Sequence, residues 1–75
     1  MKEAGIKEIS LRFGSFIQEG RFRKKYTQRD MAALLDISQV YYCHIEQGKR
    51  TVDFFLAVEI CKKLDLDIND FIKSL

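Results

Sequence analysis

The sequence predicts an all-α fold built from five helices. Apolar residues recur at intervals of three and four along most of the 75 residues, which is the spacing that gives a helix one buried face. Residues that favour helix N-caps begin the later segments, and the chain contains no proline to break a helix. We expect residues 1–75 to form one domain, because domains are commonly about 50–250 residues long.

The first predicted helix runs from about Leu11 to Lys24. Its expected buried stripe consists of Leu11, Phe13, Phe16, Ile17 and Gly20. Gly14 and Gly20 each weaken a helix by up to about 1 kcal/mol relative to alanine, so we expect close packing at both positions. Residues 1–10 have two interpretations, an extension of this helix or a loose N-terminal arm.

The second predicted helix begins at a strong N-terminal signal. Thr27 is a suitable N-cap, and Asp30 stands three positions later as a shortened form of the capping-box acid. The apolar residues that follow have helical spacing: Met31, Leu34 and Leu35. The helix is therefore expected to end near Leu35.

The third predicted helix follows after a very short connection. Ser38 is its N-cap, the helix continues to Gln47, and Gly48 is a C-terminal stop. Only Asp36 and Ile37 separate the two helices. A connection of this length forces a sharp turn between short helices, which is the geometry of a helix-turn-helix.

Two further helices complete the predicted fold. Asp53 caps one that runs from Phe54 to Leu64, and Asp67 caps the last, with Asp70 at its third position. The apolar stripe expected on the last helix consists of Ile68, Phe71, Ile72 and Leu75.

Several classes of function are excluded on composition. No apolar run approaches the about 20 residues of a membrane-spanning helix, and the N-terminus lacks the apolar centre of a signal peptide. Cys43 and Cys61 lie within helical patterns, which favours reduced thiols and a cytoplasmic protein. Cys43 and His44 diverge by about 100° on a helix, so we expect no metal site. With a single histidine and no nucleophile–base pair, we expect no enzyme, no cofactor and no small-molecule ligand.

Charge is distributed unevenly along the chain. Residues 1–20 have three bases and three acids, residues 21–50 have seven bases and three acids (+4), and residues 51–75 have three bases and five acids (−2), giving the net +2. This pattern indicates a face for a polyanion and another kept away from it. An ordinary solvated surface is the alternative.

The run from Thr27 to Arg50 resembles the signature of the phage repressor and Cro family of helix-turn-helix regulators, also called XRE. The matching positions are Thr27-Gln28, Met31-Ala32, Ser38, Ile45-Glu46 and Gly48-Lys49. The resemblance extends over about residues 11–75, and it implies a lambda-repressor-like fold that binds double-stranded DNA. There are two departures from the family pattern. Asp36 replaces the usual turn glycine, and Phe55-Leu56 is more apolar than usual.

Within this resemblance, the third helix would read DNA. Its inner face would pack on the core through Tyr42, Ile45 and Glu46, whereas its outer face comprises Gln39, Val40, Cys43 and His44. We expect Gln39 to pair with adenine, Val40 to contact a thymine methyl group and His44 to donate to a base or a phosphate. The alternative is that Gln39 and His44 are simply exposed polar residues.

Other residues would contact the DNA backbone or hold the reading helix. Gln28 resembles the family's phosphate-clamping glutamine, and the expected neighbours on the strand are Tyr41, Gln47, Lys49 and Arg50. Peripheral phosphate contacts or solvated charges are the two interpretations of Arg23, Lys24, Lys25 and Arg29. The resemblance pairs Glu46 with Arg21, and the alternative is an exposed acid.

We therefore expect a stand-alone transcriptional regulator, of the repressor or restriction–modification controller type, associated with the nucleoid. It would act as a homodimer on a near-palindromic operator, with half-sites about 34–36 Å apart. The expected dimer surface comprises Phe55, Leu56, Ile72 and Leu75, although the same residues could be extra core. The alternative function is a protein-interaction module, such as an antitoxin-like partner binder, that retains the fold.

Overall fold

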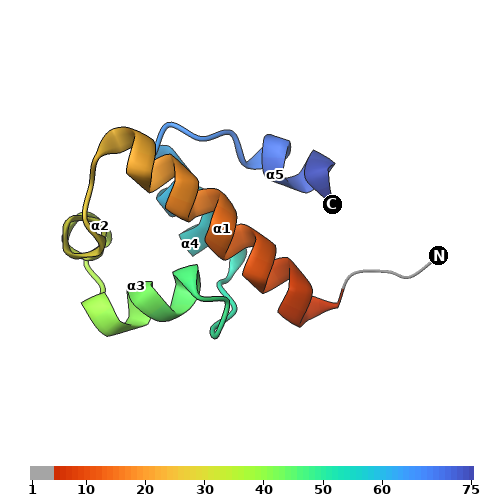
Figure 1. The fold of residues 1–75 in the computed structure, drawn as a ribbon, viewed down its shortest axis with the longest axis horizontal. Helices are drawn as coiled ribbons and strands as arrows, with labels where there is room; N and C mark the ends of the chain where they lie inside the picture. The colour runs from red at the N-terminus through yellow and green to blue at the C-terminus, as the bar shows by residue number, and fades with distance from the viewer. Residues whose placement is uncertain (1–4) are drawn as a thin grey trace.

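The computed structural model describes residues 5–75 and contains five helices and no strand within that range. The helices are α1 (Ile6–Lys24), α2 (Gln28–Leu35), α3 (Gln39–Glu46), α4 (Phe54–Lys63) and α5 (Ile68–Ser74). The α1 helix crosses the molecule, with α3 on one side and α5 on the other (Figure 1). The predicted all-α fold with five helices is confirmed.

The first helix begins earlier than Leu11. It starts at Ile6, so residues 6–10 extend this helix and do not form a loose arm. Residues 1–4 lie outside the described residues. Gly5 provides no side-chain cap, which is why the sequence signal there is weak. The helix ends at Lys24, and the C-cap residue Lys25 has a left-handed backbone (φ 61°), so that its N–H bonds the carbonyls of Arg21 and Phe22.

The predicted caps account for the later helix starts. Thr27 and Asp30 form a reciprocal capping box, with hydrogen bonds of 3.0 and 2.8 Å. Ser38, Asp53 and Asp67 each accept a hydrogen bond from a backbone N–H in the first turn of the following helix. Because such a cap typically stabilises a helix by about 1 kcal/mol, these short helices depend on them.

The turn between α2 and α3 depends on Asp36. This residue has a left-handed backbone with φ 55°, and its N–H bonds the carbonyls of Ala32 and Ala33. Aspartate tolerates this conformation better than most residues with a side chain, so the family's usual glycine is not required.

The core lies where the five helices meet. Its buried apolar residues are Phe13, Ile17, Met31, Ala32, Tyr42, Ile45, Ala57, Ile60, Cys61, Leu64 and Phe71. The Phe13 and Phe71 rings meet edge to face at 5.2 Å, which joins α1 to α5. Full burial of a large apolar side chain contributes about 1.5–3 kcal/mol, so this small cluster carries most of the stability.

Some apolar residues of the predicted helical stripes are exposed. Leu11 is 47% exposed, Leu34 46%, Ile72 53% and Leu75 49%. Leu11 lies against the turn at Gly48, which follows α3, and nearly half of its surface stays open to solvent. The short α2 and α5 helices each bury one side only, so the flanking apolar positions of their stripes remain in solvent. The prediction of burial was therefore wrong at Leu11.

Gly14 explains how α3 approaches α1 so closely. A Cβ atom at this position would collide with the backbone carbonyl of Glu46 and would lie 2.8 Å from the carbonyl oxygen of Ile45. Real Cβ atoms are essentially never that close to another atom, so the last turn of α3 can pack against α1 only over a glycine. Among residues 5–75, no helix is long and apolar enough to cross a membrane.

Candidate nucleic-acid interface

The α3 helix has one buried face and one open face. Tyr42, Ile45 and Glu46 are buried, whereas Gln39 is exposed and Val40 is 65% exposed. His44 is partly buried. The first turn of α3 therefore presents an amide and an apolar side chain to the solvent, on a helix that is fixed from behind.

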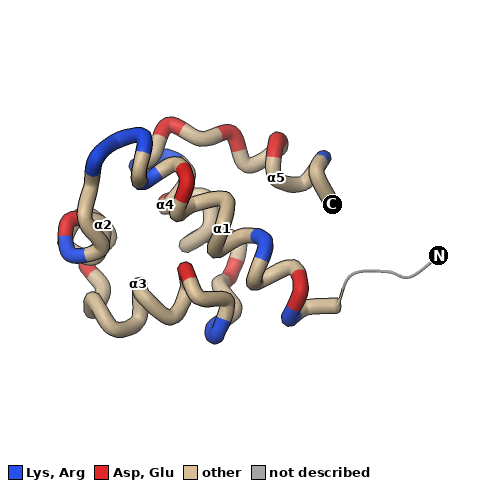
Figure 2. Tube along the Cα trace, viewed as in Figure 1, with Lys and Arg blue, Asp and Glu red and all other residues tan. Residues whose placement is uncertain are grey.

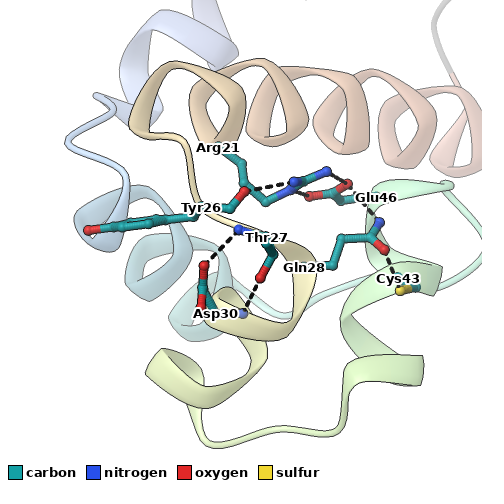
Figure 3. A network of polar contacts seen from close by, with 7 residues as sticks. All are labelled: Arg21, Tyr26, Thr27, Gln28, Asp30, Cys43 and Glu46. Carbon is teal, nitrogen blue, oxygen red and sulfur yellow. Dashed lines mark hydrogen bonds and ion pairs between the residues drawn. The ribbon is translucent and has the colours of Figure 1, made fainter.

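An ion pair holds α3 against α1 (Figure 3). The Arg21 Nε atom donates to Glu46 Oε2 at 2.6 Å, and Arg21 Nη2 donates to Glu46 Oε1 at 3.0 Å. Arg21 Nη1 also donates to the Tyr26 carbonyl at 2.9 Å. Both charged residues are only 7% exposed, so one guanidinium joins α1, the α1–α2 connection and α3 within the protein interior.

The contacts of Glu46 keep its carboxylate ionised. Burial alone would raise its pKa, but hydrogen bonds from Arg21 and Gln28 hold the pKa below its ordinary value. The hydrogen bond to Glu46 correspondingly raises the pKa of Arg21. Both partners are therefore charged at neutral pH.

Two residues that were assigned other roles join this ion pair. The Gln28 Nε2 atom donates to Glu46 Oε1 at 3.1 Å, and the Cys43 thiol donates to Gln28 Oε1 at 2.9 Å. The Gln28 amide thus faces inward, rather than lying free beside Lys49 and Arg50. The resemblance had paired Glu46 with Arg21, and the three-residue spacing of Cys43 and Glu46, which makes them neighbours on α3, was the signal that could have linked both to Gln28.

The residues expected to contact phosphates lie around the two ends of α3. Gln47, Lys49 and Arg50 are exposed beyond its C-terminus, and the Arg50 guanidinium lies 5.1 Å from the centre of the Tyr41 ring. Such a stacked cation is held in place without losing its charge. Tyr41 and Arg50 therefore form one unit on the surface.

Two basic residues at the end of α1 form ion pairs within the protein. Lys24 forms an ion pair with Asp65, which raises the pKa of the lysine. Arg23 makes only an exposed contact with Glu19 at 3.5 Å. Basic residues follow α1 and α3, whereas acidic residues mark the segment leading into α5 (Figure 2).

A metal site or a reactive thiol or hydroxyl group would place other requirements on the described residues. In residues 5–75, no three histidine, cysteine, aspartate or glutamate side chains are grouped as metal ligands. Cys61 is buried, and this burial raises the pKa of its thiol to about 11. The buried Tyr42 hydroxyl has no hydrogen-bond partner among the described residues, and its burial raises its pKa.

The comparisons with known proteins agree on one family. The helix-turn-helix family model HTH_3 matches residues 17–71. Control protein C.MunI from a Mycoplasma species is 28% identical over 71 residues, which are 93% of this chain and 96% of that protein.

Two solved structures share the fold. One is the clp gene regulator ClgR from Corynebacterium glutamicum, with a TM-score of 0.80 and 23% identity over 85% of this chain and 68% of that one. The other is the restriction-modification controller protein C.AhdI from Aeromonas hydrophila, with a TM-score of 0.75 and 24% identity over 83% of this chain and 94% of that one.

Replacement of Arg21 tests the anchoring of α3. Arg21→Ala leaves the Glu46 carboxylate buried without its partner, and we expect a loss of about 3–5 kcal/mol of unfolding free energy. In a domain of this size that lowers the melting temperature by more than about 10 °C. Arg23→Ala is the control, because Arg23 is exposed, and it should change the melting temperature by less than about 2 °C. Equal effects in thermal melts followed by circular dichroism would contradict this anchoring.

The lowered pKa of Glu46 predicts a pH dependence. Since the folded pKa lies below the ordinary value of about 4.5, the stabilisation is complete above that value and is lost as the pH falls through the folded pKa. The free-energy difference between the wild type and Glu46→Gln should therefore shrink between pH 6 and pH 3. Urea titrations at several pH values measure it, and a constant difference would refute the assignment.

The family match, the confirmed five-helix fold and the open outer face of α3 lead to one conclusion. The chain belongs to the helix-turn-helix family of DNA-binding transcription regulators, of the phage repressor and Cro type.

Proposed function

We propose that this protein is a sequence-specific regulator of the restriction–modification controller type, which binds a near-palindromic operator as a homodimer in the cytoplasm. The observation that carries the proposal is the open first turn of α3 on a helix whose inner face is buried and ion-paired. The named control protein, which matches over nearly its whole length, supports the biological type.

The outer face of α3 suits direct readout in the major groove. Gln39 lies in the first turn, where its amide could pair with both N6 and N7 of adenine. Val40 offers a large exposed apolar surface to a thymine methyl group. His44 lies deeper and would donate to a base edge or a phosphate at the margin of the contact.

The DNA backbone would be held on both sides of this helix. Lys49 and Arg50 supply positive charge beyond its C-terminus, with Tyr41 stacked on Arg50 and Gln47 between them in the chain. On the other side, the N-terminus of α2 favours an anion. There Gln28 would contribute through the N–H that its bond to Glu46 leaves unused. These contacts position the protein without reading sequence.

An apolar surface on α4 and α5 suits a second copy of the chain. Phe55 is 80% exposed and Phe54 64%, with their ring centres 6.0 Å apart. Exposed apolar side chains continue at Ile72 and Leu75, whereas Leu56 is partly buried against the core. Small domains commonly gain stability by association, and a dimer contact would account for the apolar departure at position 55.

A protein-interaction module remains the second candidate function. The exposed Phe54–Phe55 pair favours it, because a different protein could cover the same apolar surface. DNA binding distinguishes the two candidates.

The proposed base contact of Gln39 and the proposed phosphate contact of Lys49 predict different losses of DNA binding. The operator is first selected from random duplex DNA, and affinity is then titrated at two salt concentrations. Gln39→Ala should lose about 1–3 kcal/mol of discrimination at one base pair in each half-site. Lys49→Ala should weaken binding to all duplexes alike and reduce the salt slope by about 1 per copy bound. If the wild type binds no duplex even at low salt, the regulator proposal fails.

The dimer surface predicts an effect on oligomeric state. Phe55→Ser should weaken self-association at least about ten-fold, because a large aromatic ring would no longer be buried. Leu34→Ser, at an exposed apolar residue of α2, is the control and should leave it unchanged. Sedimentation velocity over a range of concentrations measures both. A monomeric wild type, or a Phe55→Ser variant that still dimerises fully, would refute this surface.

A further inference from the structure

We infer that Cys43 is a positioning residue, whose thiol together with the Glu46 carboxylate holds the Gln28 amide and thereby sets the pose of α3 for DNA. This inference rests on the proposed function for its role in DNA binding. The geometry on which it depends exists in the free protein and can be tested there. Cys43 lies on the outer side of α3, but its inferred role is to hold Gln28 and not to contact a base.

The two charged residues, Arg21 and Glu46, determine which atom donates in each hydrogen bond of the network. Arg21 can only donate, so the ionised Glu46 carboxylate accepts from it and can only accept from Gln28 as well. The Gln28 nitrogen must therefore face Glu46, because the opposite orientation would bring two acceptor oxygens together. The amide oxygen of Gln28 is left facing Cys43, where it needs a donor.

Cys43 supplies that donor from the same helix that carries Glu46. Its sulfur lies 2.9 Å from Gln28 Oε1, while Gln28 Nε2 lies 3.1 Å from Glu46 Oε1. Gln28 is the first residue of α2, so its amide spans from α2 to two successive turns of α3 (Figure 3). Two hydrogen bonds of defined direction thus fix α3 relative to the N-terminus of α2.

The role is one of position rather than of core stability. Cys43 and Gln28 are only partly buried, and neither belongs to the buried apolar cluster. Loss of the thiol allows the Gln28 amide to turn out into water while the helices persist. The expected result is a folded protein whose reading helix and α2 N-terminus no longer approach DNA in one fixed arrangement.

The free protein provides the first test. In Cys43→Ala, the side-chain amide resonances of Gln28 should move toward those of a solvent-exposed glutamine, and in Cys43→Ser, which keeps a donor, they should stay near those of the wild type. Nuclear magnetic resonance without DNA measures both variants. Unchanged Gln28 resonances in Cys43→Ala would overturn the proposed contact, whether or not the protein binds DNA.

A double-mutant cycle provides the second test, with a duplex selected from random DNA as the probe. Cys43→Ala should weaken binding about three- to ten-fold with little change in melting temperature, and Cys43→Ser should restore affinity to within about two-fold. In a Gln28→Leu background, Cys43→Ala should cause no further loss. An equal loss in both backgrounds, or one confined to a single base pair, would instead show that Cys43 contacts DNA directly and would overturn the inference. A wild type that binds no duplex would defeat the proposed function, while the resonance test would still decide the Gln28 contact.

Discussion

The buried contact between Arg21 and Glu46 is the constraint on which the rest of the structure depends. Removing two charges from water is costly, and the cost is offset only when the geometry is good and the remaining hydrogen-bonding groups are satisfied. Here the guanidinium makes two bonds to the carboxylate and one to the Tyr26 carbonyl, and the carboxylate accepts a further bond from Gln28. Few arrangements of α1, α2 and α3 satisfy all of these bonds, so the pair selects one.

This constraint explains how a chain of 75 residues can present a fixed surface to DNA. A small core alone specifies orientation poorly, because apolar contacts have little directional preference. The ion pair and the close approach over Gly14 hold the inner side of α3, which frees its outer side for recognition. Basic residues lie just beyond the C-terminus of α3 and in the connection between α1 and α2, and the acidic segment before α5 lies apart from α3 (Figure 2). The basic middle and the acidic end of the sequence meet at the ion pair between Lys24 and Asp65.

Local signals in the sequence predicted much of this fold, because they act over a few residues. The caps at Thr27 and Ser38 define their helix starts, and the two-residue spacer predicts the turn. The exposure of Leu11 and Leu34 could not be predicted in this way, because it depends on which residues of other helices reach them. The inward Gln28 amide was missed for a related reason. Its partners are 15 and 18 residues away, and only the folded chain brings them together.

The central claim is that the outer side of α3 meets DNA while α1 holds its inner side. Titration of the isotope-labelled protein with its selected duplex, followed by backbone amide resonances, tests this claim most directly. The account predicts large shifts from Gln39 to His44 and around Lys49 and Arg50, with little change in α5. Large shifts concentrated in α5 and around Phe55, with α3 unaffected, would contradict it.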